Sequence, residues 1–195
     1  MFIKFILNNP YKHIIRGVIS MTNVVEPKKV AEWFIQKKLD NPTNTGKGNM
    51  KLQKLLFFSQ LIYMCKNNGK TMYNEMFSAF DNGMVLEPIR QEYLHNYEQL
   101  KNDSENVIEL PNDVKDSLNI TVDIFGQCSA DELSELSHQF EAWSKYLSLS
   151  IEDNNYHNKQ KAIVPYDELE KELYKMNKVL KAYEERNLNT TEEDY

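Results

Sequence analysis

The sequence predicts a mainly α-helical protein: a compact multi-helix domain of about six helices with one small β-hairpin. Four prolines each stand just before an amphipathic stretch, where proline fits because the first-turn N–H of a helix has no intrahelical partner. These prolines are Pro27, Pro88, Pro111 and Pro165. Apolar residues recur at helical spacing in the stretches that follow. Only six glycines and six prolines occur in 195 residues, which disfavours a β architecture built on many tight turns.

The predicted elements follow one another with short polar connections. The helix that begins at the capping box Ser129–Glu132 has the clearest start, because the Ser129 hydroxyl and the Glu132 carboxylate can each satisfy an unpaired N–H. A hairpin is predicted between Met76 and Val85, where Asp81-Asn82-Gly83 separates two short runs. The other predicted helices cover residues 27–39, 50–66, 88–100, 112–125 and 167–184, and residues 43–49 are predicted to form a polar loop.

We divide the chain into three parts. Residues 25–150 form the predicted helical domain, and residues 151–195 form a C-terminal helix followed by an acidic tail. Residues 1–24 are assigned to an N-terminal extension. Within it, residues 1–20 are interpreted as a stretch upstream of a natural start at Met21; a partner-binding arm and a targeting segment are the alternatives. Polar residues interrupt the apolar run of this extension, so it lacks the continuous apolar region of a signal peptide and is too short to cross a bilayer.

Charge and cysteine content restrict the function classes. The formal net charge is −6, which disfavours a broad, salt-dependent grip on nucleic acid. Cys65 and Cys128 are typical of reduced thiols in a cytoplasmic protein without membrane association. A group of lysines makes the N-terminal third locally basic, and we interpret it as a solvated face. These lysines are Lys28, Lys29, Lys37, Lys38, Lys47, Lys51 and Lys54.

No motif predicts a catalytic, cofactor or metal site. The four histidines and two cysteines have no metal-ligand spacing. Gly69-Lys70-Thr71 resembles the end of a phosphate-binding loop, but Met64 stands where that loop needs a glycine. Cys128 and His138 flank one helix start and could form a nucleophile–base pair. We favour a structural interpretation of the two residues, in which Cys128 is a small residue before the helix and His138 stands at the helix end.

Three blocks of the sequence, in order, resemble the Panacea antitoxin family. Residues 50–60 (MKLQKLLFFSQ) resemble its opening motif. Residues 79–88 resemble the next segment, an aromatic turn before a proline-started helix. Residues 125–143 resemble the third block, in which S-A-x-x-L-S-x-L leads to a histidine and a tryptophan. Several positions depart from the family pattern, among them Phe80, Met84 and Ala142, so the chain is identified as a divergent member.

The resemblance implies a fold of packed helices with a small β element and a protein-binding role. The expected function is an antitoxin that binds and neutralises a cognate toxin or other protein partner. The alternative is a phage-type regulatory or effector protein that binds a host complex or nucleic acid. Nucleic acid is disfavoured by the acidic charge, and the resemblance implies neither an enzymatic activity nor a cofactor.

The motif residues are expected to be mostly structural. We expect the motif leucines and Trp143 to lie in the core, and the two motif glycines to meet backbone needs at turns. His138 is interpreted either as structural or as part of a binding surface. Truncating a buried motif leucine to alanine should cost roughly 2–5 kcal/mol. The complete set is Lys51, Leu52, Gln53, Lys54, Leu55, Gly83, Pro88, Gly126, Ser129, Glu132, Leu133, Leu136, His138 and Trp143.

Overall fold

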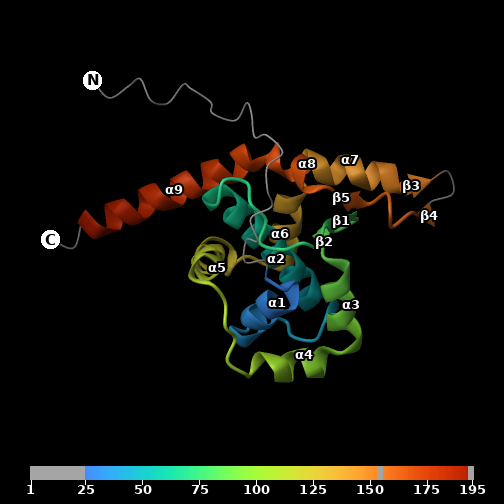
Figure 1. Cartoon of the computed structure of the whole chain (residues 1–195), viewed down its shortest axis with the longest axis horizontal. Coiled ribbons are helices and arrows are strands. Elements are labelled where there is room, and N and C mark those ends of the chain that lie inside the picture. The colour runs from blue at the N-terminus through green and yellow to red at the C-terminus, as the bar shows by residue number, and fades with distance from the viewer. Residues whose placement is uncertain (1–24, 153–155, 193–195) are drawn as a thin grey trace, which may run out of the picture.

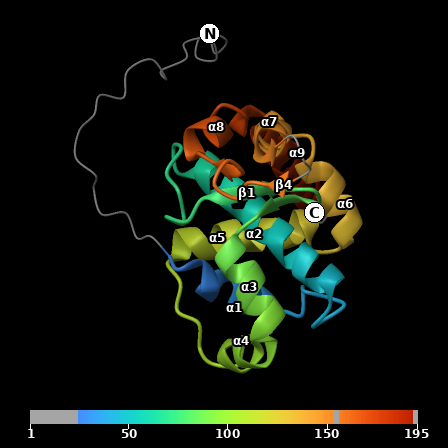
Figure 2. The ribbon, with the colours of Figure 1, turned by 90° about the vertical axis from the view of Figure 1, so that its right-hand side faces the viewer.

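Helix α2 (Gly46–Lys66) lies at the centre of the fold, and the other elements pack around it (Figures 1 and 2). The computed structural model describes residues 25–152 and 156–192; the predicted extension 1–24 and the acidic end 193–195 lie outside them. Every residue from Lys51 to Met64 is buried, as expected for a helix enclosed on all sides. The predicted loop 43–49 is partly wrong. Residues 46–49 form the first turn of α2, and the Thr45 side chain accepts a hydrogen bond from Gly48 N at 3.0 Å.

The prediction of a mainly helical domain with a small β element is confirmed. Helices α1, α3 and α4 lie on one side of α2, whereas α7, α8 and α9 lie on the other (Figures 1 and 2). The other helices of the described residues are α1 (Pro27–Gln36), α3 (Glu87–His95), α4 (Tyr97–Ser104), α5 (Asn112–Phe125), α6 (Ala130–Ser137), α7 (Glu141–Ser150), α8 (Tyr166–Glu170) and α9 (Leu173–Glu192). None of the helices in the described part of the chain is long and apolar enough to cross a membrane.

The predicted hairpin is formed by strands β1 (Phe77–Phe80) and β2 (Gly83–Val85), which pair antiparallel with Phe80 opposite Gly83. A third strand, β5 (Ile163–Val164), pairs with the other edge of β1, so the sheet order is β2-β1-β5. Strands β3 (Ile151–Glu152) and β4 (Tyr156–His157) form a separate pair. The sequence did not indicate the third strand, because two residues are too short to show a strand period.

Two predicted helices are each divided in the structure. The helix predicted over residues 88–100 breaks at Asn96, whose φ of −132° is not helical, and becomes α3 and α4. The helix predicted from residue 167 breaks before Leu173. At this break the buried carboxylate of Glu172 accepts hydrogen bonds from Glu141 N at 2.8 Å and Ala142 N at 2.7 Å. Glu172 therefore caps the N-terminus of α7, a helix that the sequence analysis did not predict.

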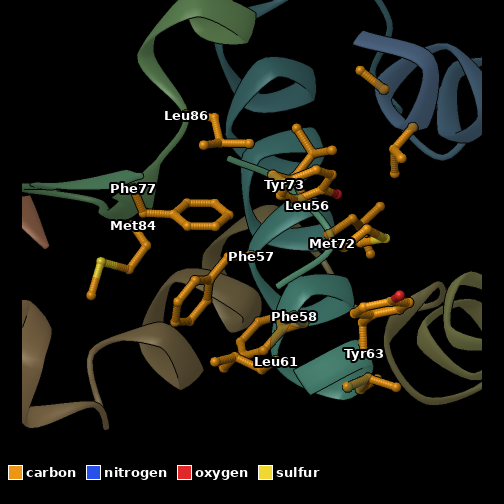
Figure 3. Close-up of a cluster of buried hydrophobic side chains, with 14 of the residues drawn as sticks. Leu56, Phe57, Phe58, Leu61, Tyr63, Met72, Tyr73, Phe77, Met84 and Leu86 are labelled. Atoms are coloured by element: carbon orange, nitrogen blue, oxygen red, sulfur yellow. The ribbon is translucent and has the colours of Figure 1, made fainter. Parts of the chain in front are cut away.

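One hydrophobic core includes described residues on both sides of residue 150. Figure 3 shows the part of it around α2 and the hairpin. Phe57 of α2 lies edge-on to Phe77 of β1 and to Phe140, with ring centroids 5.3 Å apart in each pair. Figure 3 shows Phe57 and Phe77 pointing toward each other. The C-terminal part contributes apolar side chains to the same core: Val164, Leu169, Leu173, Met176 and Leu180.

The expectation that Leu136 lies in the core is wrong. Helix α6 buries Ala130, Leu133, Ser134 and Ser137, which recur at helical spacing on one face. Leu136 lies off that face, and its side chain is 41% exposed. Apolarity alone therefore assigned Leu136 to the wrong side of the helix.

Candidate functional site

The polar motif side chains meet around the β1–β2 hairpin. From α2, Gln53 accepts a hydrogen bond from Leu86 N at 2.8 Å, and the Lys54 ammonium donates to the Met84 carbonyl oxygen at 2.9 Å. These two neighbouring side chains thus pair backbone groups of β2 and the residue after it. Buried backbone groups that lack a partner are costly, so both bonds help to hold the hairpin against α2.

Helices α6 and α7 hold the turn of the same hairpin. The Ser134 hydroxyl donates to the Asn82 carbonyl oxygen at 2.9 Å, and the Trp143 indole N–H donates to the Phe80 carbonyl oxygen at 2.8 Å. The His138 ring stacks on Trp143 with centroids 3.8 Å apart and hydrogen-bonds to the backbone of Asp81. We call Gln53, Lys54, Ser134, His138 and Trp143 the hairpin frame.

His138 is expected to be mainly neutral near pH 7. Burial and the nearby Lys54 lower the pKa of the ring, against an opposing effect of its hydrogen bond to the Asp81 backbone. His138 is the C-cap of helix α6, a position that favours a protonated ring, yet burial makes the net shift of its pKa a lowering. The half-buried ring therefore has a structural role beside the turn. Of the two alternatives left open by the sequence, the geometry favours the structural one.

Two lysines that were assigned to a solvated basic face are in fact buried. Lys54 is fully buried and Lys51 is 8% exposed. Lys51 donates to the Gly126 carbonyl oxygen at 2.9 Å, whereas Lys54 forms no ion pair within the described residues. Burial lowers the pKa of Lys54 to about 7. Both amino groups lie inside the domain, where each one hydrogen-bonds to a backbone carbonyl group of a neighbouring segment.

The pKa of Lys54 gives a prediction for stability against pH. The folded protein releases the Lys54 proton near pH 7, whereas the unfolded chain releases it near 10.5. Between these values the unfolded chain binds more protons, so the free energy of unfolding should rise with pH. We expect it to rise from pH 7 to about 9.5 relative to Lys54→Met, with urea unfolding as the measurement. Lys29→Met, at an exposed position, is the control, and parallel curves for wild type and Lys54→Met would contradict this assignment.

The remaining motif residues serve the backbone and the core. The capping box is confirmed: Glu132 N donates to Ser129 Oγ at 3.2 Å, and Ser129 N donates to the Glu132 carboxylate at 2.7 Å. Leu52, Leu55 and Leu133 are fully buried. Pro88 is exposed in the first turn of α3.

Glycine is required at the two motif positions for different physical reasons. Gly83 adopts φ +96°, which confirms the predicted backbone need at the turn. Gly126 has φ −60°, in the ordinary helical region, so the same expectation is wrong there. Glycine is needed at position 126 because there is no room for a side chain: a Cβ atom there would lie 2.6 Å from the Val122 carbonyl oxygen.

The other chemical candidates are not assembled into a site. Cys128 precedes α6 and His138 follows it, so the eight-residue helix, about 12 Å long, separates them. Burial raises the pKa of the Cys128 thiol, which disfavours the thiolate that a nucleophile needs. In residues 25–152 and 156–192 no group of three or more His, Cys, Asp and Glu side chains is placed to hold a metal ion.

A pocket of about 230 Å³ opens beside the hairpin, between α2 and α3. Its wall combines apolar side chains with the frame residues Gln53 and Lys54. Arg90 stands at the wall with its guanidinium 5.3 Å from the Phe80 ring centroid, and it forms an ion pair with Glu87 at 2.6 Å. The lining residues are Gly46, Asn49, Met50, Gln53, Lys54, Phe80, Asp81, Asn82, Val85, Arg90 and Leu94.

Sequence reasoning missed the shared role of the polar residues on α2. Gln60 repeats the action of Gln53 one heptad later, because its side chain accepts from Met72 N at 3.1 Å and Tyr73 N at 3.3 Å. The available signal was the spacing itself: Gln53 and Gln60 lie seven residues apart in a helix whose central part contains the apolar runs 55–58 and 61–64. Polar residues in such a helix are buried and need partners.

Comparison with known proteins gives one match. The family model described as antitoxin SocA-like, Panacea domain matches residues 52–144. This segment runs from α2 into α7 and contains the hairpin and all five residues of the hairpin frame. Searches of curated proteins and of solved structures return no match to this chain.

Proposed function

Because residues 52–144 carry a SocA-like Panacea domain, we propose that this protein is an antitoxin that binds a partner toxin directly and neutralises it in the complex. The family match is the observation that carries this proposal. The proposed action is protein binding without a catalytic step. It takes place in the cytosol, which agrees with Cys65 and Cys128 being free thiols.

The structure supports a particular contact surface for the toxin. The hairpin frame fixes the backbone of the hairpin from inside, while Asp81 and Asn82 stay exposed at the turn. The pocket beside this turn has Met50 and the 49% exposed Leu94 in its wall. Small apolar pockets with polar edges are typical anchor points of protein interfaces. We therefore place the toxin contact at the hairpin turn and this pocket.

The nucleic-acid alternative loses its supporting observation. It depended on seven lysines in the N-terminal third, of which Lys51 and Lys54 are buried. Lys28 lies 2.9 Å from the Asp103 carboxylate, and Lys47 pairs with Asp131. The exposed, unpaired basic surface that would bind phosphates is therefore much smaller than the sequence suggested.

The proposal predicts that Leu94→Asp weakens the complex without unfolding the protein. A carboxylate at this edge of the pocket would be desolvated against the toxin, which costs binding free energy of about 2 kcal/mol or more, a factor of roughly 30 in affinity. The measurement is co-purification and calorimetric titration with the product of the neighbouring reading frame.

Val107→Asp is the matched control for this experiment, because Val107 is 90% exposed and lies outside the pocket. It should leave the affinity unchanged. Equal weakening by both variants would contradict the proposed surface. A wild-type protein that forms no complex with any neighbouring product would contradict the antitoxin proposal itself.

A further inference from the structure

A buried carboxylate, Asp40, lies at a second pocket, which is lined by residues from the end of α1, the loop that follows it and α4. Its side chain is fully buried. One carboxylate oxygen, Oδ2, accepts hydrogen bonds from the Tyr93 hydroxyl at 2.9 Å and the Tyr97 hydroxyl at 2.7 Å. Burial and the neighbouring carboxylate raise the pKa of both tyrosines. Both hydroxyls therefore remain protonated and donate to Asp40.

The other oxygen of Asp40 has no partner. Oδ1 is buried, and no described residue donates a hydrogen bond to it. Within residues 25–152 and 156–192 no Lys, Arg or His side chain forms an ion pair with Asp40. A buried carboxylate is costly unless it is paired or fully hydrogen-bonded, and each oxygen can accept about two bonds. Asp40 Oδ1 would therefore be stabilised by a hydrogen-bond donor, and most of all by a positively charged one.

Asp40 lines a pocket of about 450 Å³. Other residues that carry acceptor groups also line the pocket: Thr43, Asn44, Glu98 and Glu105. Two exposed lysines, Lys38 and Lys101, also line the pocket, and their charges balance those of the two glutamates. The buried Asp40 therefore sets the sign of the charge that the pocket favours.

We propose that this pocket binds a guanidinium group, which reaches Asp40 Oδ1, its principal acceptor, once the side chains that cover this oxygen move aside. A guanidinium carries five N–H donors in one plane, which matches several acceptors better than the compact ammonium does. Tyr97 also lines the pocket, and guanidinium groups pack well against aromatic rings. The group is either the arginine side chain of a protein partner or a free guanidinium compound, and the chemistry at Asp40 is the same.

The first test uses N-ethylguanidinium with the full chain alone and follows backbone amide signals by NMR. We expect saturable shifts of Asn44 and Tyr97. Asp40→Asn keeps an acceptor for the tyrosines but removes the charge, so binding should weaken roughly tenfold or more. Asp116→Asn, an exposed charge-matched variant on α5, should bind as the wild type does. N-ethylurea, which is neutral and similar in shape, should not bind to the wild type.

The proposal is overturned if N-ethylguanidinium gives no saturable shift at these residues, or if N-ethylurea binds equally well. The urea comparison uses the wild type, so it remains decisive even if Asp40→Asn fails to fold. A second arm identifies the source of the group. In the toxin complex of the proposed function, a partner arginine would block N-ethylguanidinium from the pocket, whereas a free ligand would still enter. Because the first arm needs no toxin, failure of the antitoxin proposal leaves this result intact.

Discussion

Gly83→Ala is expected to lower the free energy of unfolding by about 2–4 kcal/mol, the combined cost of a strained backbone and an overpacked site. Gly83 adopts φ +96°, where a side chain is unfavourable. An added Cβ would also collide with the Ser137 hydroxyl and lie 2.9 Å from Lys54 Cε. The hairpin would have to move away from the hairpin frame. Urea unfolding measures the loss, and NMR amide signals of residues 77–85 report the displacement.

Gly46→Ala is the matched control for this substitution. Gly46 is the first residue of α2, and an added Cβ there meets no atom within 4 Å. Alanine favours helix by up to about 1 kcal/mol over glycine, so this variant should be as stable as the wild type or slightly more stable. A Gly83→Ala protein that matches Gly46→Ala in stability would show that the hairpin is not held against α2 and α6.

Leu55→Ala is expected to cost roughly 2–5 kcal/mol, because it removes a fully buried side chain from the centre of α2 and leaves a cavity. Leu136→Ala should cost less than about 1 kcal/mol, since the Leu136 side chain is 41% exposed and lies off the buried face of α6. Both residues belong to the family motif, and both are leucines on helices. Thermal and urea unfolding of the two variants would show whether the loss of stability follows the burial of the leucine or its place in the motif. Equal losses in the free energy of unfolding would contradict the burial described for α6.

Local signals in the sequence predicted the parts of the fold that depend on local chemistry. The capping box at Ser129 and Glu132, the hairpin turn before Gly83 and the proline-started helices all depend on residues within a few positions of one another. The breaks at Asn96 and Glu172 could not be predicted in this way. Glu172 turns the chain because its carboxylate caps α7, thirty residues earlier in the sequence.

The candidate site was predicted as a set of residues but not as an arrangement. The three sequence blocks identified Gln53, Lys54, His138 and Trp143, yet nothing local indicated that all four act on the same hairpin. A lysine is normally exposed, so Lys54 was assigned to a solvated face. Its burial depends on the Met84 carbonyl oxygen, which reaches it only in the folded chain. Asp40 was missed for a similar reason, because its partners Tyr93 and Tyr97 lie more than fifty residues away.

The hairpin frame suggests how a motif without catalytic chemistry can serve a binding protein. All five of its side chains hydrogen-bond to backbone groups of residues 80–86, and the His138 ring also stacks on Trp143. A backbone fixed in this way loses little conformational freedom when a partner binds, which favours affinity. The exposed turn residues Asp81 and Asn82 can then determine which partner fits, while the frame remains the same.

Growth of cells that express the neighbouring reading frame, with and without this chain, tests the antitoxin proposal most directly. We expect the neighbouring product alone to arrest growth, co-expression of this chain to restore it, and Val107→Asp to restore it equally well. Leu94→Asp should remain soluble and restore growth poorly. If no neighbouring product is toxic, or if soluble wild-type protein fails to restore growth, the proposal that this protein acts as an antitoxin is contradicted.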